Sequence, residues 1–229
     1  MKKKTNKKKL KIGLGIIVLI IAGTLLFVWY QQKRPMQQLL KRQARESAPS
    51  KTGKEKRAAI IIASKDFRDE EYFKTHEVLF KGEIEMKIVS SEKGTAIGAD
   101  GGEVNIDLTL DELKVDDFDA IVFIGGPGAP KYLDNEKSYR IAREAIKKNK
   151  ILAAICISPT ILAKAGVLQG KKATVWASPL DRQPIKILEE NGAEYIDEKV
   201  VQDGKIITGN GPQAAEEFGQ KILELLKNN

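Results

Sequence analysis

The sequence predicts a three-layer α/β sandwich with a mostly parallel sheet, preceded by one membrane-spanning helix. From residue 58 onward, short apolar runs alternate with segments of helical periodicity, which is typical of a parallel sheet covered by helices on both faces. Ahead of this domain, residues 12–30 form an uncharged run long enough to cross a bilayer. With 229 residues and 42% hydrophobic content, the chain can bury one full core beside an accessory segment.

The N-terminus predicts a single-span membrane anchor. A basic tail, residues 1–11, contains seven lysines and leads into the uncharged run 12–30. As a helix, those residues would span roughly 28 Å at 1.5 Å per residue, the thickness of a hydrocarbon core. A cleaved signal peptide is the alternative, but it has a shorter apolar region and a small-residue cleavage site. This run instead ends in Trp29 and Tyr30, aromatic residues that favour a membrane interface.

The flanks of the run predict its orientation and a tether. The N-terminal lysine cluster is denser than the basic cluster within residues 33–45, which favours a cytoplasmic N-terminus. We therefore expect a protein of the cell membrane whose folded domain lies on the extracytoplasmic side, with the lipid bilayer as partner of residues 12–30. Residues 31–57, rich in Gln, Lys, Arg, Ser and Pro, predict a polar basic linker.

The charge distribution excludes several functions for the domain. The net charge of +8 combines unlike parts: residues 1–57 hold 16 Lys and Arg against 2 Asp and Glu, whereas residues 58–229 hold 23 against 29. The domain is thus mildly acidic, and we expect no nucleic-acid partner. One cysteine excludes an internal disulfide, and a single histidine leaves no Cys/His cluster for zinc. We expect neither a metal nor a cofactor.

Within residues 58–229, strands and helices are expected to alternate in order. Buried apolar runs predict the strands, apolar residues at helical spacing predict the helices, and three glycines among alternating residues predict a β-hairpin at 94–110. The predicted strands are 58–63, 86–89, 119–124, 151–155, 173–176, 199–202 and 206–208; the predicted helices are 69–80, 136–148, 159–165, 184–191 and 214–226. Sites in such sheets form at the C-terminal ends of strands, which directs attention to three junctions.

The junction after residues 151–155 holds the candidate reactive group. This strand delivers Cys156 to a sharp turn, and Pro159 stands where it can open a helix. Free backbone N–H groups and the helix dipole predict a thiol pKa below its ordinary value. A buried, inert cysteine that packs as a small hydrophobe is the alternative, and the local sequence does not choose between the two.

The other two junctions offer groups that could act on this thiol. The strand 119–124 runs into Gly125 and Gly126, where the backbone can approach a neighbouring group and offer an N–H as half of an oxyanion hole. The turn after the first strand, within residues 63–71, supplies carboxylates at the start of a helix. Most of these are expected to face solvent, while one could reach Cys156.

Four ordered stretches carry a family resemblance: 67–71, 118–130, 153–176 and 201–218. The resemblance that rests on them extends over nearly all of residues 58–229. The domain resembles the PfpI family, which includes intracellular proteases and the Parkinson disease protein 7 deglycases. The resemblance implies a flavodoxin-like fold of the class I glutamine amidotransferase-like superfamily, and assembly into a homodimer or larger oligomer.

The resemblance also implies a site. Cys156 matches the family's nucleophile, Glu71 the carboxylic acid that hydrogen-bonds it, and Gly126 with Ile157 the backbone amides that face it. The rest of the implied pocket consists of Gly125, Asn210, Gly211 and Pro212.

The departures from the family concern its general bases. Protease-like members have a histidine after the cysteine, where this chain has Ile157; deglycase-like members have one before a later proline, where residues 177–179 read Ala-Ser-Pro. Asn210 stands where an arginine is often found. His76 cannot take over, because five residues along a helix turn its side chain about 140° away from Glu71.

Three functions remain open at this point. The first is a cysteine-dependent enzyme, hydrolase-like or glyoxalase-like, that acts on small electrophiles with Glu71 as the acid–base group. The second is a redox-protective module in which Cys156 is oxidised. The third is a non-catalytic, membrane-tethered binding or chaperone-like domain. The missing histidines argue against an efficient protease, and retention of the pocket argues against the third function.

Overall fold

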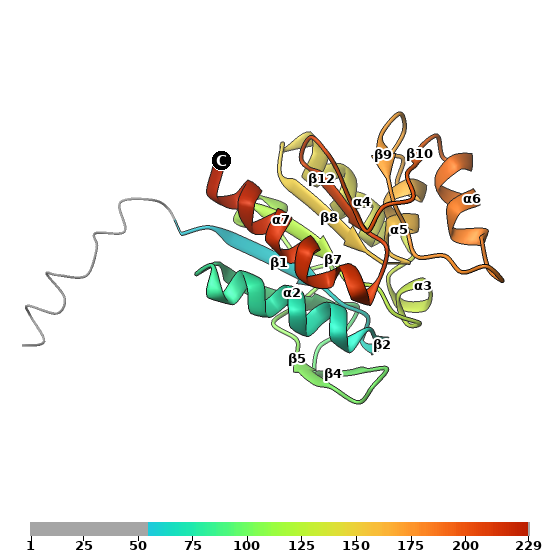
Figure 1. The fold of residues 1–229 in the computed structure, drawn as a ribbon. Helices are drawn as coiled ribbons and strands as arrows, with labels where there is room; N and C mark the ends of the chain where they lie inside the picture. Colours follow the sequence, from blue (N-terminus) through green and yellow to red (C-terminus); the bar gives the residue numbers. More distant parts are fainter. Residues whose placement is uncertain (1–54, 229) are drawn as a thin grey trace, which may run out of the picture. The chain divides into compact units, whose positions relative to one another are not determined.

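The computed structural model describes residues 55–228 of the chain (Figure 1). The expected anchor at 12–30 and most of the expected linker at 31–57 lie outside the described residues. Within residues 55–228, no helix is both long and apolar enough to cross a membrane.

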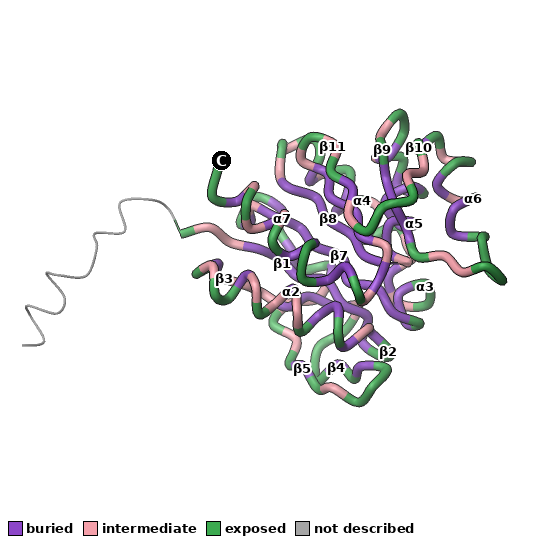
Figure 2. Tube along the Cα trace, viewed as in Figure 1, coloured by how far each residue is buried: buried purple, intermediate pink, exposed green. Residues whose placement is uncertain are grey.

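A seven-stranded sheet forms the centre of the domain, in the order β11-β12-β8-β7-β1-β3-β6. Its strands are β1 (Arg57–Ile61), β3 (Glu85–Ser90), β6 (Leu108–Thr109), β7 (Ala120–Phe123), β8 (Ile151–Ile155), β11 (Val200–Asp203) and β12 (Ile206–Gly209). Every pairing is parallel except that of β11 with β12, which confirms the predicted mostly parallel sheet. Figure 2 shows the central strands buried, as expected for a sheet covered on both faces.

Helices cover both faces of this sheet. The helices of the domain are α2 (Asp69–Lys81), α3 (Ala129–Tyr132), α4 (Glu136–Lys147), α5 (Pro159–Lys164), α6 (Gln183–Glu190) and α7 (Ala215–Asn228), with short 3₁₀ turns η1 (Val115–Asp117) and η2 (Pro212–Ala214). Figure 1 shows α2 and α7 side by side on one face, with α4 and α5 on the other. A Cβ at Gly219 of α7 would lie 3.1 Å from Val78 Cβ of α2, so glycine permits this close packing. The five predicted helices are confirmed within two residues at each end.

A three-stranded sheet extends from the start of α2. Its strands are β2 (Lys65–Phe67), β4 (Thr95–Gly98) and β5 (Glu103–Asn105). The antiparallel pairing of β4 with β5 is the predicted hairpin, whereas the parallel pairing of β2 with β4 was not expected. Asp69 holds the hairpin turn to α2, because its carboxylate accepts hydrogen bonds from the backbone N–H groups of Asp100 at 2.8 Å and Gly102 at 2.6 Å.

The predicted strand at 173–176 is mostly wrong. Only β9 (Lys172–Ala173) is a strand, and it pairs with β10 (Glu194–Tyr195) rather than with the main sheet. The residues that follow direct their N–H groups elsewhere: Thr174 donates to Thr208 Oγ1 at 2.9 Å, and Trp176 donates to the carbonyl oxygen of Cys156. This segment therefore supports the turn after β8 instead of extending a strand.

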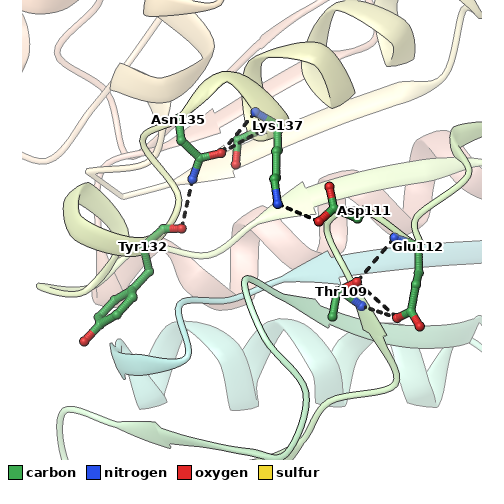
Figure 3. Close-up of polar contacts among 7 residues, drawn as sticks. Thr109, Asp111, Glu112, Tyr132, Asn135 and Lys137 are labelled. Carbon is green, nitrogen blue, oxygen red and sulfur yellow. Dashed lines mark hydrogen bonds and ion pairs between the residues drawn. The ribbon is translucent and has the colours of Figure 1, made fainter.

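Polar contacts fix the start of α4 on its face of the sheet (Figure 3). Asn135 caps the helix: its Oδ1 accepts from the backbone N–H groups of Lys137 at 3.1 Å and Ser138 at 3.4 Å, and its Nδ2 donates to the carbonyl oxygen of Tyr132 at 3.0 Å. The Lys137 ammonium pairs with Asp111 at 2.5 Å. The helix that covers β7 and β8 is thus tied to the loop after β6.

Candidate active site around Cys156

Cys156 lies in a strained turn at the C-terminal end of β8. Its backbone φ of 102° is in the left-handed region, which residues other than glycine rarely adopt. A hydrogen bond fixes the turn against the neighbouring strand end, because Ser158 Oγ donates to the Ile124 carbonyl oxygen at 2.9 Å. Helix α5 begins directly after the turn, at Pro159. The cysteine is 7% exposed. A strained, hydrogen-bonded turn with a side chain at its tip is the geometry of a nucleophile elbow.

The thiol borders a cavity of about 320 Å³. Its walls are mainly apolar, and in the described part of the chain Arg68 is the one charged residue that lines it. The lining residues are Arg68, Gly126, Pro127, Pro130, Cys156, Ile157, Trp176 and Pro212. The cavity is large enough for a small organic molecule.

Glu71 places a carboxyl group against the thiol. It is the third residue of α2 and is completely buried. Its Oε2 accepts a hydrogen bond from the N–H of Gly125 at 3.1 Å, and its carboxyl is in hydrogen-bonding contact with the thiol of Cys156. Within residues 55–228, its Oε1 is buried without a hydrogen bond of ordinary geometry. The backbone thus holds one oxygen, and the carboxyl reaches the thiol without itself lining the cavity.

Burial sets the acidity of this carboxyl group. It raises the pKa of Glu71 from 4.5 to about 7, against the opposing effects of the Cys156 thiol, the Gly125 N–H and the charge of Arg68. A carboxyl group with such a pKa exchanges its proton near neutral pH. It can therefore act both as a base and as an acid without the help of a histidine.

The predicted lowering of the thiol pKa is wrong. Burial raises the pKa of Cys156, and the adjacent Glu71 carboxylate raises it further, whereas the N–H groups of Ile157 and Gly126 lower it. The expected contribution of the helix dipole is small, because α5 has only six residues. Glu71, which is in contact with the thiol, is the group placed to accept its proton.

Two glycines allow the backbone to approach this pair. A Cβ at Gly125 would lie 2.7 Å from Cys156 Cβ and 2.9 Å from Glu71 Oε2. Gly126 has a φ of 112°, and a Cβ there would lie 2.4 Å from the backbone nitrogen of Arg68. No other residue type fits at either position without displacing the site. Close approach brings the N–H of Gly126 to the sulfur, beside that of Ile157.

The remaining predicted residues lie next to the cavity or away from it. Asn210 and Gly211 line a neighbouring pocket of about 410 Å³, and Pro212 borders both pockets, as does Trp176. His76 lies on α2 outside both, between the rings of Tyr72 and Phe80. Residues 55–228 contain no group of three or more His, Cys, Asp or Glu side chains arranged to hold a metal ion.

Four lining residues were not predicted: Arg68, Pro127, Pro130 and Trp176. Arg68 stands immediately before the predicted helix, and Trp176 ends the predicted strand at 173–176. Both lie at the C-terminal side of predicted strands, where sites collect in parallel sheets. Applying that rule to side chains of every type, not only to carboxylates and thiols, would have found them.

Comparisons with known proteins agree with this architecture. Residues 56–225 match the DJ-1/PfpI family. Deglycase PfpI of Pyrococcus furiosus is 34% identical over 168 residues, which cover 73% of this chain and 98% of that protein. Glutathione-independent glyoxalase DJR-1.2 of Caenorhabditis elegans is 29% identical over 173 residues, which cover 76% of this chain and 90% of that protein. The crystal structure of a ThiJ/PfpI domain protein from Brachyspira murdochii matches with a TM-score of 0.72 and 29% identity, over 77% of this chain and 99% of that chain. This chain therefore belongs to the DJ-1/PfpI family.

Proposed function

We propose that this chain is a cysteine-dependent enzyme of the deglycase and glyoxalase class that converts small α-oxoaldehydes. Cys156 serves as the nucleophile and Glu71 as the acid–base group. One observation carries the proposal: a buried carboxyl group with a pKa of about 7 touches the thiol, and the thiol borders a small, mainly apolar cavity. The names of the deglycase and glyoxalase relatives support the same class of reaction.

The first step forms a bond between sulfur and substrate. The Glu71 carboxylate takes the proton of the Cys156 thiol, and the sulfur adds to the aldehyde carbon while the carbonyl electrons move to oxygen. The N–H groups of Gly126 and Ile157, which contact the sulfur, stabilise negative charge at this point. Glu71 then returns the proton to the new alkoxide. The product is a neutral hemithioacetal.

The second step moves hydrogen between the two substrate carbons. Glu71, ionised again, removes the C–H proton of the former aldehyde carbon, and the electron pair forms an enediol. Protonation at the neighbouring carbon gives a thioester of a 2-hydroxy acid, which water hydrolyses to release the acid and the thiol. The aldehyde carbon is oxidised and the ketone carbon is reduced, so the sequence consumes one water and needs no external oxidant.

Turnover of methylglyoxal to lactate tests this proposal. With the full chain in mild detergent, Cys156→Ser should abolish lactate formation, and Glu71→Gln should reduce it about 10²- to 10⁴-fold, the usual contribution of a general acid–base group. Glu77→Gln, on the same helix but exposed and paired with Lys81, is the matched control and should retain activity. Lactate formation by wild type that is no faster than that by Cys156→Ser would exclude the proposed function.

A redox-protective role is the second candidate. The buried Oε1 of Glu71 could donate a hydrogen bond, when protonated, to an oxygen carried by an oxidised Cys156. Two equivalents of peroxide would convert the thiol into a sulfinic acid. Mass spectrometry would favour this role if Cys156 gained two oxygen atoms at low peroxide while methylglyoxal remained unconverted.

We further propose that residues 12–30 anchor the domain to the outer face of the cell membrane and that the protein forms a homodimer or larger oligomer. The uncharged run and the dense lysine cluster before it support the anchor and its orientation. The protein should remain in membranes washed with alkaline carbonate, and protease added to intact cells should remove the domain. Light scattering of the detergent-solubilised chain would establish its oligomeric state.

A further inference from the structure

Arg68 is out of keeping with the rest of the cavity. The other lining side chains are apolar or small, and a neutral dicarbonyl needs no cation for binding. The Arg68 side chain is 32% exposed, so its guanidinium keeps part of its hydration. Arg68 nevertheless lines the same cavity as the thiol, so its charge calls for a chemical explanation.

The main chain fixes Arg68 at the site while its side chain remains weakly engaged. The Arg68 N–H donates to the carbonyl oxygen of Gly125 at 3.0 Å, which locks the residue to the glycine loop. Its Nη1 lies 3.5 Å from Asp100 Oδ2, and the Asp100 side chain is 62% exposed. A guanidinium has five N–H donors, and this one ion pair in the described part of the chain leaves most of them to a ligand. A carboxylate is the partner that such a planar fork binds through two parallel hydrogen bonds.

The charge of Arg68 also reaches the reacting groups. Its charge lowers the pKa of the Glu71 carboxyl, against the larger effect of burial. An anionic substrate entering the cavity would be repelled by an ionised Glu71. Arg68 offsets this repulsion and gives an anion a place to bind beside Cys156.

We propose that the site selects α-oxoaldehydes that carry a carboxylate, and that Arg68 determines this preference by binding the carboxylate. This inference rests on the proposed function. A suitable probe is 4,5-dioxopentanoate, an α-oxoaldehyde with a two-carbon arm ending in a carboxylate. The steps are those already described: the thiol adds to the aldehyde, hydrogen moves to the neighbouring carbon, and one water releases 2-hydroxyglutarate.

Turnover of matched substrates tests the role of Arg68. Wild-type full chain should have a higher kcat/KM for 4,5-dioxopentanoate than for methylglyoxal. Arg68→Met should lower kcat/KM for the carboxylate substrate about 10- to 100-fold, the usual effect of losing hydrogen bonds between charged groups, with the change mainly in KM. Methylglyoxal turnover should change much less. Arg143→Met removes a charge from an exposed position on α4 and is the control. It should leave the ratio of the two kcat/KM values, 4,5-dioxopentanoate over methylglyoxal, unchanged.

A second measurement does not depend on turnover. Iodoacetate and iodoacetamide have similar size and differ in charge, and both alkylate Cys156. Relative to the chain unfolded in guanidinium chloride, the folded wild type should favour iodoacetate, Arg68→Met should lose this preference, and Arg68→Lys should keep part of it. Circular dichroism of each variant checks that it is folded.

The two measurements separate the inference from the proposed function. Conversion of neither oxoaldehyde, together with an Arg68-dependent preference for iodoacetate, would exclude the enzyme while the anion-selective site stood. Turnover of both substrates with a ratio unaffected by Arg68→Met would overturn the inference and leave the enzyme intact. A folded Cys156 that reacts with neither reagent would also overturn it, because no anion could then reach the thiol.

Discussion

Replacing Glu71 by glutamine should change how the stability of the fold depends on pH. Glu71 is completely buried, and burial raises its pKa from 4.5 to about 7. Below pH 4.5 both the folded and the unfolded chain hold this proton, so the stability contributed by the neutral carboxyl is fully present. Between pH 4.5 and about 7 the unfolded chain gives up the proton before the folded chain does, so the free energy of unfolding falls as the pH rises. Above about pH 7 the loss is complete.

The size of this effect follows from the pKa. Each pKa unit is worth about 1.4 kcal/mol, so the rise from 4.5 to about 7 corresponds to about 3 kcal/mol lost between pH 4 and pH 8. Glutamine does not ionise and resembles the protonated acid in shape. The wild type should therefore lose about 3 kcal/mol relative to Glu71→Gln over this range. Any fixed cost of accommodating the amide shifts the difference by the same amount at every pH.

Guanidinium chloride unfolding of residues 55–229, followed by circular dichroism, measures this difference at several pH values. The comparison cancels the titration of every group that the two proteins share. Glu77→Gln is the control. The ion pair with Lys81 lowers the pKa of Glu77, so the free energy of unfolding of Glu77→Gln should differ from that of wild type by a constant amount above pH 5. If the free energies of unfolding of wild type and Glu71→Gln also differed by a constant amount from pH 4.5 to 8, the burial of an ionisable carboxyl group at this position would be refuted.

Three further outcomes follow from the site and the domain boundary. Gly125→Ala should lower the free energy of unfolding by about 1–3 kcal/mol in the same assay and slow alkylation of Cys156, because its Cβ would meet the Glu71 carboxyl at 2.9 Å. The rate at which iodoacetamide alkylates Cys156 should rise with pH, with a midpoint near pH 7, where Glu71 becomes able to accept the thiol proton. Glu71→Gln should move this midpoint to higher pH, and an unmoved midpoint would exclude Glu71 as the base. Residues 55–229 should be soluble and folded by circular dichroism, whereas a chain that begins after Arg57 should unfold at lower denaturant, since Arg57 is the first residue of β1.

Patterns along the chain were sufficient for the main sheet except β6, which pairs with β3 although the sequence placed its residues in the predicted hairpin at 94–110. Every residue of β7 and β8 is buried, which is why these strands read as uninterrupted apolar runs. Helix α4 buries Ile141, Ala142 and Ala145, as helical spacing predicts, whereas Ile146, expected on the same face, is 39% exposed. By contrast, β2 has three residues, two of them exposed, and forms because it meets β4 about thirty positions later. No local pattern encodes such a pairing.

The candidate site was predictable in its parts but not in its electrostatics. The turn after β8 and the glycines after β7 follow from strand-end positions, and the resemblance supplied Glu71. The direction of the thiol pKa depends on how much water the fold removes from Cys156 and how close it brings Glu71, and neither quantity is local. The position of Arg68 likewise depends on the pairing of β2 with β4, which the sequence did not predict.

The raised thiol pKa is compatible with a reactive cysteine because the two groups share one proton. Ionising Cys156 into solvent would place a second negative charge beside the Glu71 carboxylate in a dry cavity, which burial makes unfavourable. Transfer of the proton from sulfur to Glu71 leaves the net charge of the pair unchanged. The N–H groups of Gly126 and Ile157 then favour the form that carries its charge on sulfur. Under the proposed mechanism, the protonation state of Glu71 therefore controls the reactivity of Cys156, more than titration of the thiol by solvent does.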